Sequence, residues 1–244
     1  VHLHDESTIA DAVYTAWKAD VDAGLSSLML AYSNDLATTL NERARTERIE
    51  AGTVHGPSTP LRSGLSASAG DIIITRLNDR HLRLSATDYV KNGDIFDVLA
   101  VTNDGSLQVR HRDTGRHVTL PARSGRRGGL TVGEHVDLGY AKTVHTAQGS
   151  NVDTSHSAFN GSETRQLAYT AITRGRHNNH IYVYAGGDGD PAAAIDPDTI
   201  APLTAGDIIA RIIERDGSQT SARTAIREAN DPGRILAELA PAYT

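Results

Sequence analysis

The chain has 244 residues, a formal net charge of −6, 22% charged and 39% hydrophobic residues, and no cysteine. These values exclude wholesale disorder, a disulfide scaffold, a thiolate metal site and a cysteine nucleophile. No apolar run approaches the roughly 20 residues needed to span a bilayer, so we expect a cytoplasmic protein without membrane insertion. Because the chain begins at Val1 rather than at methionine, we expect it to be a piece of a longer protein.

The first part of the chain has an alternation of helix and strand patterns. Apolar periodicity predicts a short helix over 5–19, and the apolar run 26–32 predicts a buried strand. A second helix is expected over 34–50, where apolar residues recur every fourth position. The Gly-, Pro- and Ser-rich stretch 53–69 is typical of a surface loop.

The middle of the chain changes to short strands separated by turns. Turn signals of the Asn-Gly and Asp-Gly kind separate them, which favours hairpins. A stretch of this length and pattern predicts a small β-barrel rather than part of a parallel sheet. A Gly/Arg loop over 124–129 ends this unit. The expected strands lie at 71–76, 95–102, 107–111 and 117–120.

The last part returns to α/β character. A helix is expected over 163–174, with Ser162 as its N-cap and Gly175 as the glycine that ends it. A linker over 186–202 and short acidic helices over 204–243 complete the chain. The expected strands of this part lie at 138–143, 152–159 and 181–185.

Two segments carry residues suited to chemistry. The first, YAKTVHTAQGSNVD over 140–153, places hydroxyls, an imidazole, an amide and a glycine at a strand end, where they could approach phosphates. Its composition alone favours a polar turn. The second, YTAITRGR over 169–176, ends a helix with Arg174. Taken by itself, such an arginine more often complements the helix dipole than contacts a phosphoryl group.

Together, in this order and about 25 residues apart, the two segments resemble motifs V and VI of superfamily 1 DNA helicases. The flanking stretches 22–45, 70–80 and 91–101 extend the resemblance to nearly the whole chain. They resemble the second motor half of a RecD-like, superfamily 1B helicase. More narrowly, they resemble the helicase part of a TrwC/TraI-type (MobF) conjugative relaxase. A RecD-like repair helicase is the close alternative.

The resemblance implies a fold and a division of the chain. Helicases of this kind have two RecA-like lobes with ATP between them. This chain would be the second lobe, an α/β unit with a parallel sheet, an inserted SH3-like barrel and a helical C-terminal tail. The implied division is a first lobe part at 1–66, the barrel at 67–130, the second lobe part with motifs V and VI at 131–186, and a linker with helical tail at 187–244.

The resemblance also implies roles for single residues. Arg174 would be the catalytic arginine finger, which stabilises charge on the transferring phosphoryl group. Asn41 and Arg45 match the family's text as well, although packing explains them equally. The implied nucleotide-binding residues are Gln148, Gly149 and Arg176, and the implied DNA-binding residues are Asn34, Asn78, Thr143 and His145.

Several motifs are missing from the 244 residues. None of the three lysines follows a glycine, so the chain holds no G-x-x-x-x-G-K-[ST] loop. No strand ending in Asp-Glu supplies a Mg²⁺ ligand, and the histidines lack metal-ligand spacing. We therefore expect ATP and Mg²⁺ only in the complete helicase, no metal or cofactor on this chain alone, and no activity by itself.

The implied partners are single-stranded DNA, the missing N-terminal RecA-like lobe and relaxase domain of the parent, and the conjugation machinery. Two other interpretations stay open. The chain could be a non-catalytic DNA- or protein-binding module from a degenerate helicase. A free-standing SH3-like interaction protein is a third, but it leaves motifs V and VI unexplained.

Overall fold

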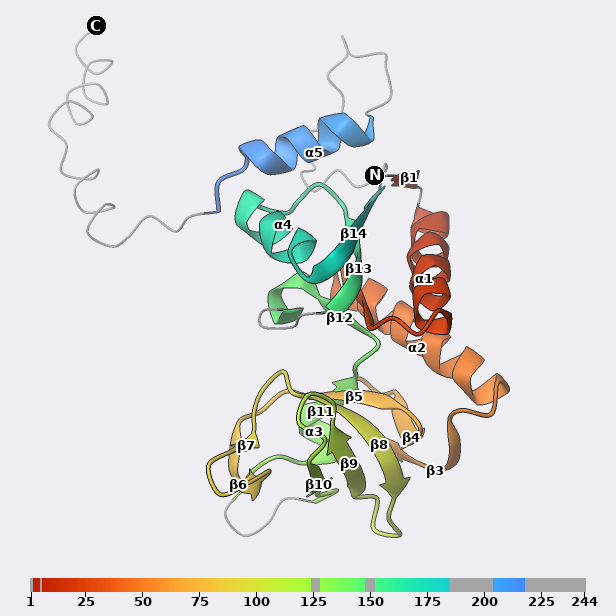
Figure 1. The fold of residues 1–244 in the computed structure, drawn as a ribbon, viewed down its shortest axis with the longest axis vertical. Coiled ribbons are helices and arrows are strands. Elements are labelled where there is room, and N and C mark those ends of the chain that lie inside the picture. The colour runs from red at the N-terminus through yellow and green to blue at the C-terminus, as the bar shows by residue number, and fades with distance from the viewer. Residues whose placement is uncertain (1, 5, 124–127, 148–151, 185–203, 218–244) are drawn as a thin grey trace, which may run out of the picture.

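A computed structural model describes residues 2–4, 6–123, 128–147, 152–184 and 204–217 of the chain. Two sheets lie one above the other in Figure 1, and helices surround the first of them. The second sheet is formed by the middle of the chain, between the strands of the first sheet that come second and third in chain order. The two sheets are described in turn.

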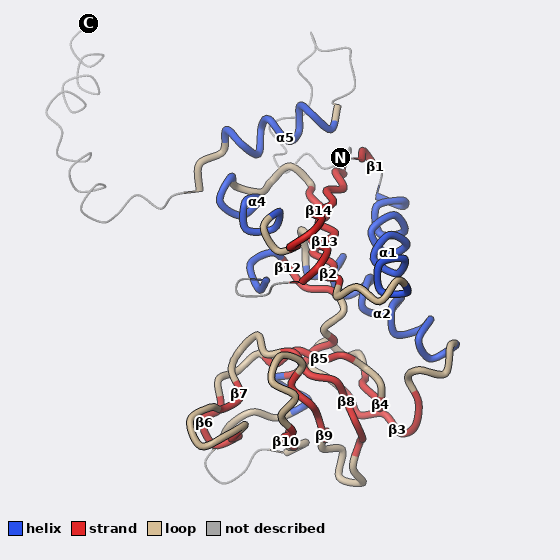
Figure 2. Tube along the Cα trace, in the orientation of Figure 1, coloured by secondary structure: helices blue, strands red, loops and turns tan. Residues whose placement is uncertain are grey.

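The first sheet has five strands, all parallel to their neighbours, in the order β1-β14-β13-β2-β12 (Figure 2). One of its central strands, Ser27–Ala31, is a short apolar segment, which is typical of a strand covered on both faces. The strands are β1 (His2–His4), β2 (Ser27–Ala31), β12 (Ala141–Thr143), β13 (Val152–Phe159) and β14 (Gly175–Tyr184).

Helices cover both faces of this sheet. Residues of β2 alternate between the two sides, so that Met29 belongs to one buried cluster and Leu30 to the other. The Met29 side is covered by α1 (Glu6–Asp22) and α2 (Asn34–Glu50). The Leu30 side is covered by the 3₁₀ turn η1 (Val144–Ala147) and α4 (Arg165–Ile172), and α5 (Ala205–Glu214) packs on α4.

The second sheet is antiparallel, with the order β10-β9-β8-β5-β11. Two short hairpins, β3–β4 and β6–β7, and the short helix α3 (Val132–His135) accompany it. We call residues 55–138 the antiparallel unit. Its strands are β3 (His55–Pro60), β4 (Ser66–Ala69), β5 (Ile72–Thr75), β6 (Asp79–Arg83), β7 (Tyr89–Val90), β8 (Ile95–Val101), β9 (Leu107–His111), β10 (His117–Leu120) and β11 (Val136–Leu138).

One buried cluster joins the two sheets. It extends from Trp17 of α1 through Tyr140 to Ile73 and Phe96 of the antiparallel unit. The rings of Trp17 and Tyr140 meet edge to face, with centroids 6.2 Å apart. The apolar core is therefore continuous across the place where the chain passes from one sheet to the other.

The strand expected over 138–143 is divided between the two sheets. Its first part is β11, which pairs with β5, and its second part is β12, which pairs with β2. Gly139 lies between them and donates its N–H to Ile72 O at 2.8 Å. A Cβ at Gly139 would lie 3.0 Å from the backbone of Ile73, so the change of sheet occurs where a side chain is hard to fit. The antiparallel sheet thus extends past residue 130, where we expected the insert to end.

Three local predictions are wrong. The expected loop 53–69 contains the β3–β4 hairpin, whose first strand contains two prolines and whose two strands hold no large apolar side chain. The N-cap of α4 is Thr164 and not Ser162, because the Ser162 hydroxyl is bonded to Asn160 Oδ1 at 2.6 Å. Gly175 is the first residue of β14 rather than the glycine that ends α4. By contrast, the helix expected over 34–50 is confirmed as α2.

Candidate nucleotide and nucleic-acid site

Arg174 lies directly after the last turn of α4. The Thr164 hydroxyl caps the start of this helix by accepting from Leu167 N at 3.3 Å. At the other end, Arg174 Nε donates to Thr170 O at 2.7 Å and Nη2 donates to Thr173 Oγ1 at 3.0 Å. The guanidinium therefore meets a carbonyl at the end of the helix, which also accepts from Thr173 Oγ1 at 3.2 Å, and complements the negative end of the helix.

The turn that presents Arg174 requires a glycine at the next position. Gly175 N donates to Asn179 Oδ1 at 2.8 Å, and Asn179 Nδ2 donates back to Gly175 O at 2.9 Å. A Cβ on Gly175 would lie 2.1 Å from Asn178 O. The pairing of β13 with β14 shifts register between Val152 and Thr154, where this loop bulges out.

Arg176 is exposed at the start of β14, at the amino edge of the parallel sheet. Its Nη1 lies 3.9 Å from Asp153 Oδ1, and the side chain is 63% exposed. The Asp153 carboxylate also accepts from the Ser26 backbone and hydroxyl, and these bonds lower its pKa. The implied role of Arg176 stays a prediction, because a solvated ion pair accounts for its position equally well.

Lys142 is a cation that the sequence reasoning missed. Its register with Leu30 turns it toward the α4 side of the sheet, and the residue is 1% exposed. Burial, and after it repulsion from Arg76 and Arg174, lower its pKa to about 8, against attraction from Asp113. Lys142 lies inside the motif V-like segment. From the sequence, the three lysines were tested only as possible members of a P-loop, which gave Lys142 no role.

Thr143 and Asn34 lie at the carboxyl ends of two neighbouring strands of the parallel sheet, β12 and β2. Thr143 ends β12 and is paired with Ala31, three residues before Asn34. Asn34 is exposed at the first position of α2, beside the N-cap Ser33. The structure therefore brings these two predicted DNA contacts to the carboxyl edge of the sheet, whereas Arg174 and Arg176 lie at its amino edge.

The other predicted residues are not brought to these two edges. Asn78 is exposed on the antiparallel unit, where its Oδ1 accepts from Asn92 N at 2.9 Å and holds a turn. His145 lies in η1, and its side chain is outside the described part of the chain. Gln148 and Gly149 also lie outside the described residues.

His156 has several structural partners. His156 Nε2 lies 2.8 Å from Asp20 Oδ2, its Nδ1 lies 3.0 Å from Tyr182 Oη, and its ring stacks on His180 with centroids 4.9 Å apart. Burial lowers the pKa of His156 even though Asp20 favours its charged form. In the described ranges, no three His, Asp or Glu side chains are grouped so that they could hold a metal ion.

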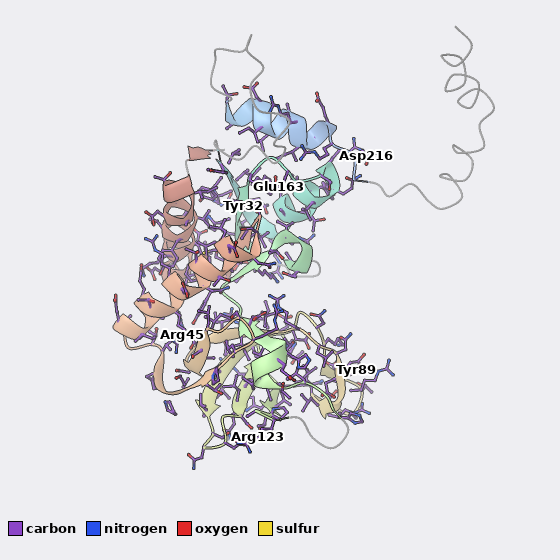
Figure 3. The ribbon with its side chains drawn as sticks, turned by 180° about the vertical axis from the view of Figure 1, so that it is seen from behind. Tyr32, Arg45, Tyr89, Arg123, Glu163 and Asp216 are labelled. Atoms are coloured by element: carbon purple, nitrogen blue, oxygen red, sulfur yellow. The ribbon has the colours of Figure 1, made fainter. Side chains whose placement is uncertain are left out.

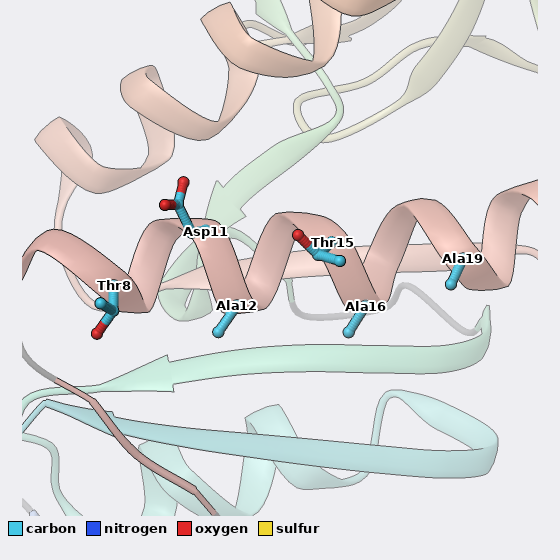
Figure 4. Close-up of a pocket in the computed structure, with 6 residues that line it drawn as sticks. All are labelled: Thr8, Asp11, Ala12, Thr15, Ala16 and Ala19. Atoms are coloured by element: carbon cyan, nitrogen blue, oxygen red, sulfur yellow. The ribbon is translucent and has the colours of Figure 1, made fainter.

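A shallow hollow runs along one side of α1, next to β14. Figure 4 shows Ala12, Ala16 and Ala19 on one side of the helix and Asp11 on the other. Asp11 is already paired with Arg43 of α2. The hollow therefore offers small side chains and hydroxyls but no uncommitted charge, and we do not assign it a chemical role.

The fold and the candidate site define the structural class of the protein. This is an α/β protein with a five-stranded parallel sheet covered on both faces, an antiparallel unit placed before its edge strand β12, and a buried lysine, Lys142, whose pKa is lowered by burial and by the charges of Arg76 and Arg174. No helix within the described ranges combines the length and the apolar character needed to cross a membrane. No protein-family model matches the chain.

The relatives then identify the kind of protein. Conjugal transfer protein TraA of Agrobacterium fabrum is 33% identical over 181 residues, covering 72% of this chain and 15% of that protein. A probable TraA of Sinorhizobium fredii is 30% identical over 172 residues, covering 68% and 14%. Uncharacterized protein Rv2311 of Mycobacterium tuberculosis is 33% identical over 100 residues, covering 41% and 54%. The chain is thus homologous to a segment of conjugal transfer proteins, which confirms the resemblance seen in its motifs.

The chain spans about one seventh of the length of the TraA proteins it matches. Among solved structures, Pif1 helicase from Bacteroides in complex with ADP-AlF3 and ssDNA aligns with a TM-score of 0.42 and 16% identity, covering 85% of this chain and 46% of that one. Pif1 helicase from Candida albicans aligns with a TM-score of 0.43 and 12% identity, covering 71% and 52%. The fold described above rests on the strands and helices of this chain, not on these alignments.

Proposed function

We propose that this chain is the second RecA-like motor lobe of an ATP-dependent 5′-to-3′ DNA helicase within a conjugative relaxase-helicase. In this proposal the antiparallel unit is the inserted SH3-like barrel, and Arg174 is the arginine finger. Thr143, His145 and Asn34 contact single-stranded DNA, with Asn78 as a further contact on the insert. Gln148, Gly149 and Arg176 serve the nucleotide. ATP and Mg²⁺ bind only when the first lobe is present.

The observation that carries the proposal is the placement of two arginines near the buried Lys142 of β12. Arg174, which follows α4, and Arg76, on the antiparallel unit, both lower the pKa of Lys142, and Arg76 is also paired with Asp137 at 2.9 Å. Three cations raise the local potential where a phosphate would bring compensating negative charge. Kinship with conjugal transfer proteins supports the same conclusion, since transfer of DNA requires strand separation by a motor.

The decisive experiment uses the whole parent protein. We expect Arg174→Ala to lower the kcat of DNA-stimulated ATP hydrolysis by about 10³-fold, because an arginine finger stabilises charge that develops only in the transition state. The dissociation constant for a single-stranded oligonucleotide should change little. Arg165→Ala is the matched control: Arg165 lies on the same helix, is 55% exposed and is paired with Asp216 at 3.5 Å.

A second candidate function is a non-catalytic binding module from a degenerate helicase. The contact of Arg174 with its own helix favours it, because that contact alone could account for the arginine. A module of this kind would keep its partner binding and show no change in ATP turnover on Arg174→Ala. Loss of DNA binding and turnover in equal measure would instead make Arg174 a structural residue.

A further inference from the structure

Three polar residues of α2 face the place where the chain leaves the parallel sheet and later returns to it. Asn41, Arg45 and Arg48 are spaced i, i+4 and i+7, so they share one face of the helix. Figure 3 shows Arg45 at the level where α2 meets the antiparallel unit. The chain leaves along 51–54, directly after α2, and returns along 139–141, before β12.

Asn41 holds the returning segment by its backbone. Its Oδ1 accepts from Tyr140 N at 3.0 Å and from Ala141 N at 2.9 Å, and its Nδ2 donates to Ala141 O at 2.9 Å. Asn41 is 6% exposed and Tyr140 is 2% exposed. One buried amide thus serves the backbone exactly between the strands β11 and β12, where leaving these groups unpaired would be costly.

Arg45 holds the antiparallel unit through Asp71. Arg45 Nε lies 3.1 Å from Asp71 Oδ2, and the other oxygen of this fully buried carboxylate accepts from Tyr140 Oη at 2.7 Å. Burial first, and then the Asp71 charge and hydrogen bond, raise the pKa of Tyr140, so its hydroxyl remains a donor. Asp71 therefore joins α2, the antiparallel unit and the returning segment in one network.

Arg48 closes the same junction. Its Nη2 donates to Gly70 O at 3.2 Å, and its guanidinium carbon lies 5.6 Å from the centre of the Tyr140 ring. Thr53 N in turn donates to Arg48 O at 2.9 Å, which fixes the outgoing segment. A Cβ on Gly70 would lie 1.9 Å from Thr53 O, so the outgoing segment and the turn between β4 and β5 touch backbone to backbone.

We propose that this network is a coupling device: it makes the antiparallel unit and the parallel sheet open as one body, and Tyr140 acts as a positioning residue for the DNA-contacting segment that begins at Thr143. The second half of the proposal rests on the proposed function. Tyr140 lies three residues before Thr143 and is held on both its backbone and its hydroxyl. A change in the antiparallel unit is therefore transmitted to β12 without an intervening flexible linker.

The test uses the full chain and the variant Tyr140→Phe, which removes one hydroxyl and keeps the ring. Hydrogen exchange is followed by mass spectrometry on peptides from β5 and β8, and on peptides from β2 and β13. In the wild type we expect both sets to exchange through one common opening. In Tyr140→Phe we expect the antiparallel peptides to exchange about fivefold or more faster than the parallel ones, a change typical of a lost coupling energy.

The matched control is Tyr182→Phe. Tyr182 is also buried, and its Oη lies 3.0 Å from His156 Nδ1, but it stands on β14 away from the junction. It should lower the midpoint of unfolding while both sets of peptides still exchange together. Equal exchange in Tyr140→Phe, or the same split in Tyr182→Phe, would overturn the coupling.

The positioning role has its own readout, the affinity for a fluorescent oligo-dT across a salt series. We expect Tyr140→Phe to weaken binding about fivefold and to reduce the salt slope, because fewer phosphates are then contacted together. Tyr182→Phe should leave both unchanged. Unchanged binding in Tyr140→Phe would overturn the positioning role. A wild type that binds no DNA would instead count against the proposed function, and the exchange result would still decide the coupling.

Discussion

The Arg174 guanidinium donates from Nε to the carbonyl oxygen of Thr170, one turn earlier in α4, at 2.7 Å. The side chain is therefore held against the end of its own helix by a bond that any helix C-terminus can offer. A phosphate at this site would have to compete with hydrogen bonds of this kind, including the one from Arg174 Nη2 to Thr173 Oγ1 at 3.0 Å, and each contributes only modestly to stability. The helix-end role and the finger role of Arg174 are thus compatible in one molecule.

Arg174→Ala should have a small effect on the stability of the isolated chain. We expect the free energy of unfolding to fall by about 0.5–1 kcal/mol, because the helix-end hydrogen bonds to Thr170 and Thr173 and their dipole contribution are lost. Urea unfolding followed by circular dichroism measures this. A loss of several kcal/mol would mean that any fall in ATP turnover in the parent reflects misfolding of this lobe.

Gly175→Ala should be far more harmful than its exposure suggests. The new Cβ would meet Asn178 O at 2.1 Å, a backbone atom that cannot move without opening the bulge of β14. We expect a loss of about 2 kcal/mol or more in stability. Gly133→Ala is the control, since nothing lies within 4 Å of a Cβ there. Thermal unfolding of the two variants side by side makes the comparison, and equal melting temperatures would refute the clash.

Lys142→Met should stabilise the chain at neutral pH. The folded-state pKa of Lys142, about 8, is below its ordinary 10.5. The unfolded chain therefore binds the proton more tightly, and stability rises with pH between about 8 and 10.5. Below pH 8 the full cost is present, at most about 3 kcal/mol. Removing the amine should recover part of this free-energy cost. It should also flatten the dependence of stability on pH between about 8 and 10.5. Urea titrations at pH 7, 8.5 and 10 would show it.

In the parent protein the same Lys142→Met change should reduce ATP turnover or DNA affinity, because a cation beside Arg174 is lost. Gain of stability together with loss of function is the expected outcome for a charge kept for binding. If Lys142→Met lowers stability at pH 7 and leaves the pH dependence unchanged, the lysine makes a net favourable contact in the fold.

Acid should weaken the fold through His156. Its folded-state pKa is lowered from 6.5, mainly by burial, so the unfolded chain binds more protons and stability falls as the pH drops below about 6.5. The Asp20 carboxylate stays ionised as the pH begins to fall, because its pKa is lowered. Burial raises this pKa, but hydrogen bonds from Thr154 and His156 outweigh the effect of burial. His156→Gln should give a shallower fall between pH 6.5 and 5 by urea unfolding, and an identical slope would exclude His156 as the titrating group.

The sequence predicted those elements whose patterns are local and apolar. The helix over 34–50 and the strand within 26–32 are both found, since periodic leucines and a short apolar run determine them. The longer extent of β14 was missed because its first half, Gly175–His180, is polar and exposed and has no apolar alternation. The β3–β4 hairpin was missed for the same reason.

The residues of the candidate site were predictable only where they lie within a single sequence motif. Arg174 was singled out from its neighbours in the chain, but its charge and that of Arg76 act on Lys142 across long stretches of sequence, which no local pattern reveals. Asn41 and Arg45 are a similar case: the helix pattern shows them as polar positions on α2, while their partners Ala141 and Asp71 stand 100 and 26 residues away.

The two crossings of the chain meet at one face of one helix, and this has an evolutionary consequence. The parallel sheet keeps the order β14-β13-β2-β12 whatever lies between Thr53 and Gly139, because α2 receives both ends of the excursion at the same spot. An ancestor could therefore acquire, enlarge or exchange the excursion as a graft, with the rest of the lobe unaltered. Any inserted segment would have to form hydrogen bonds with the polar face of α2.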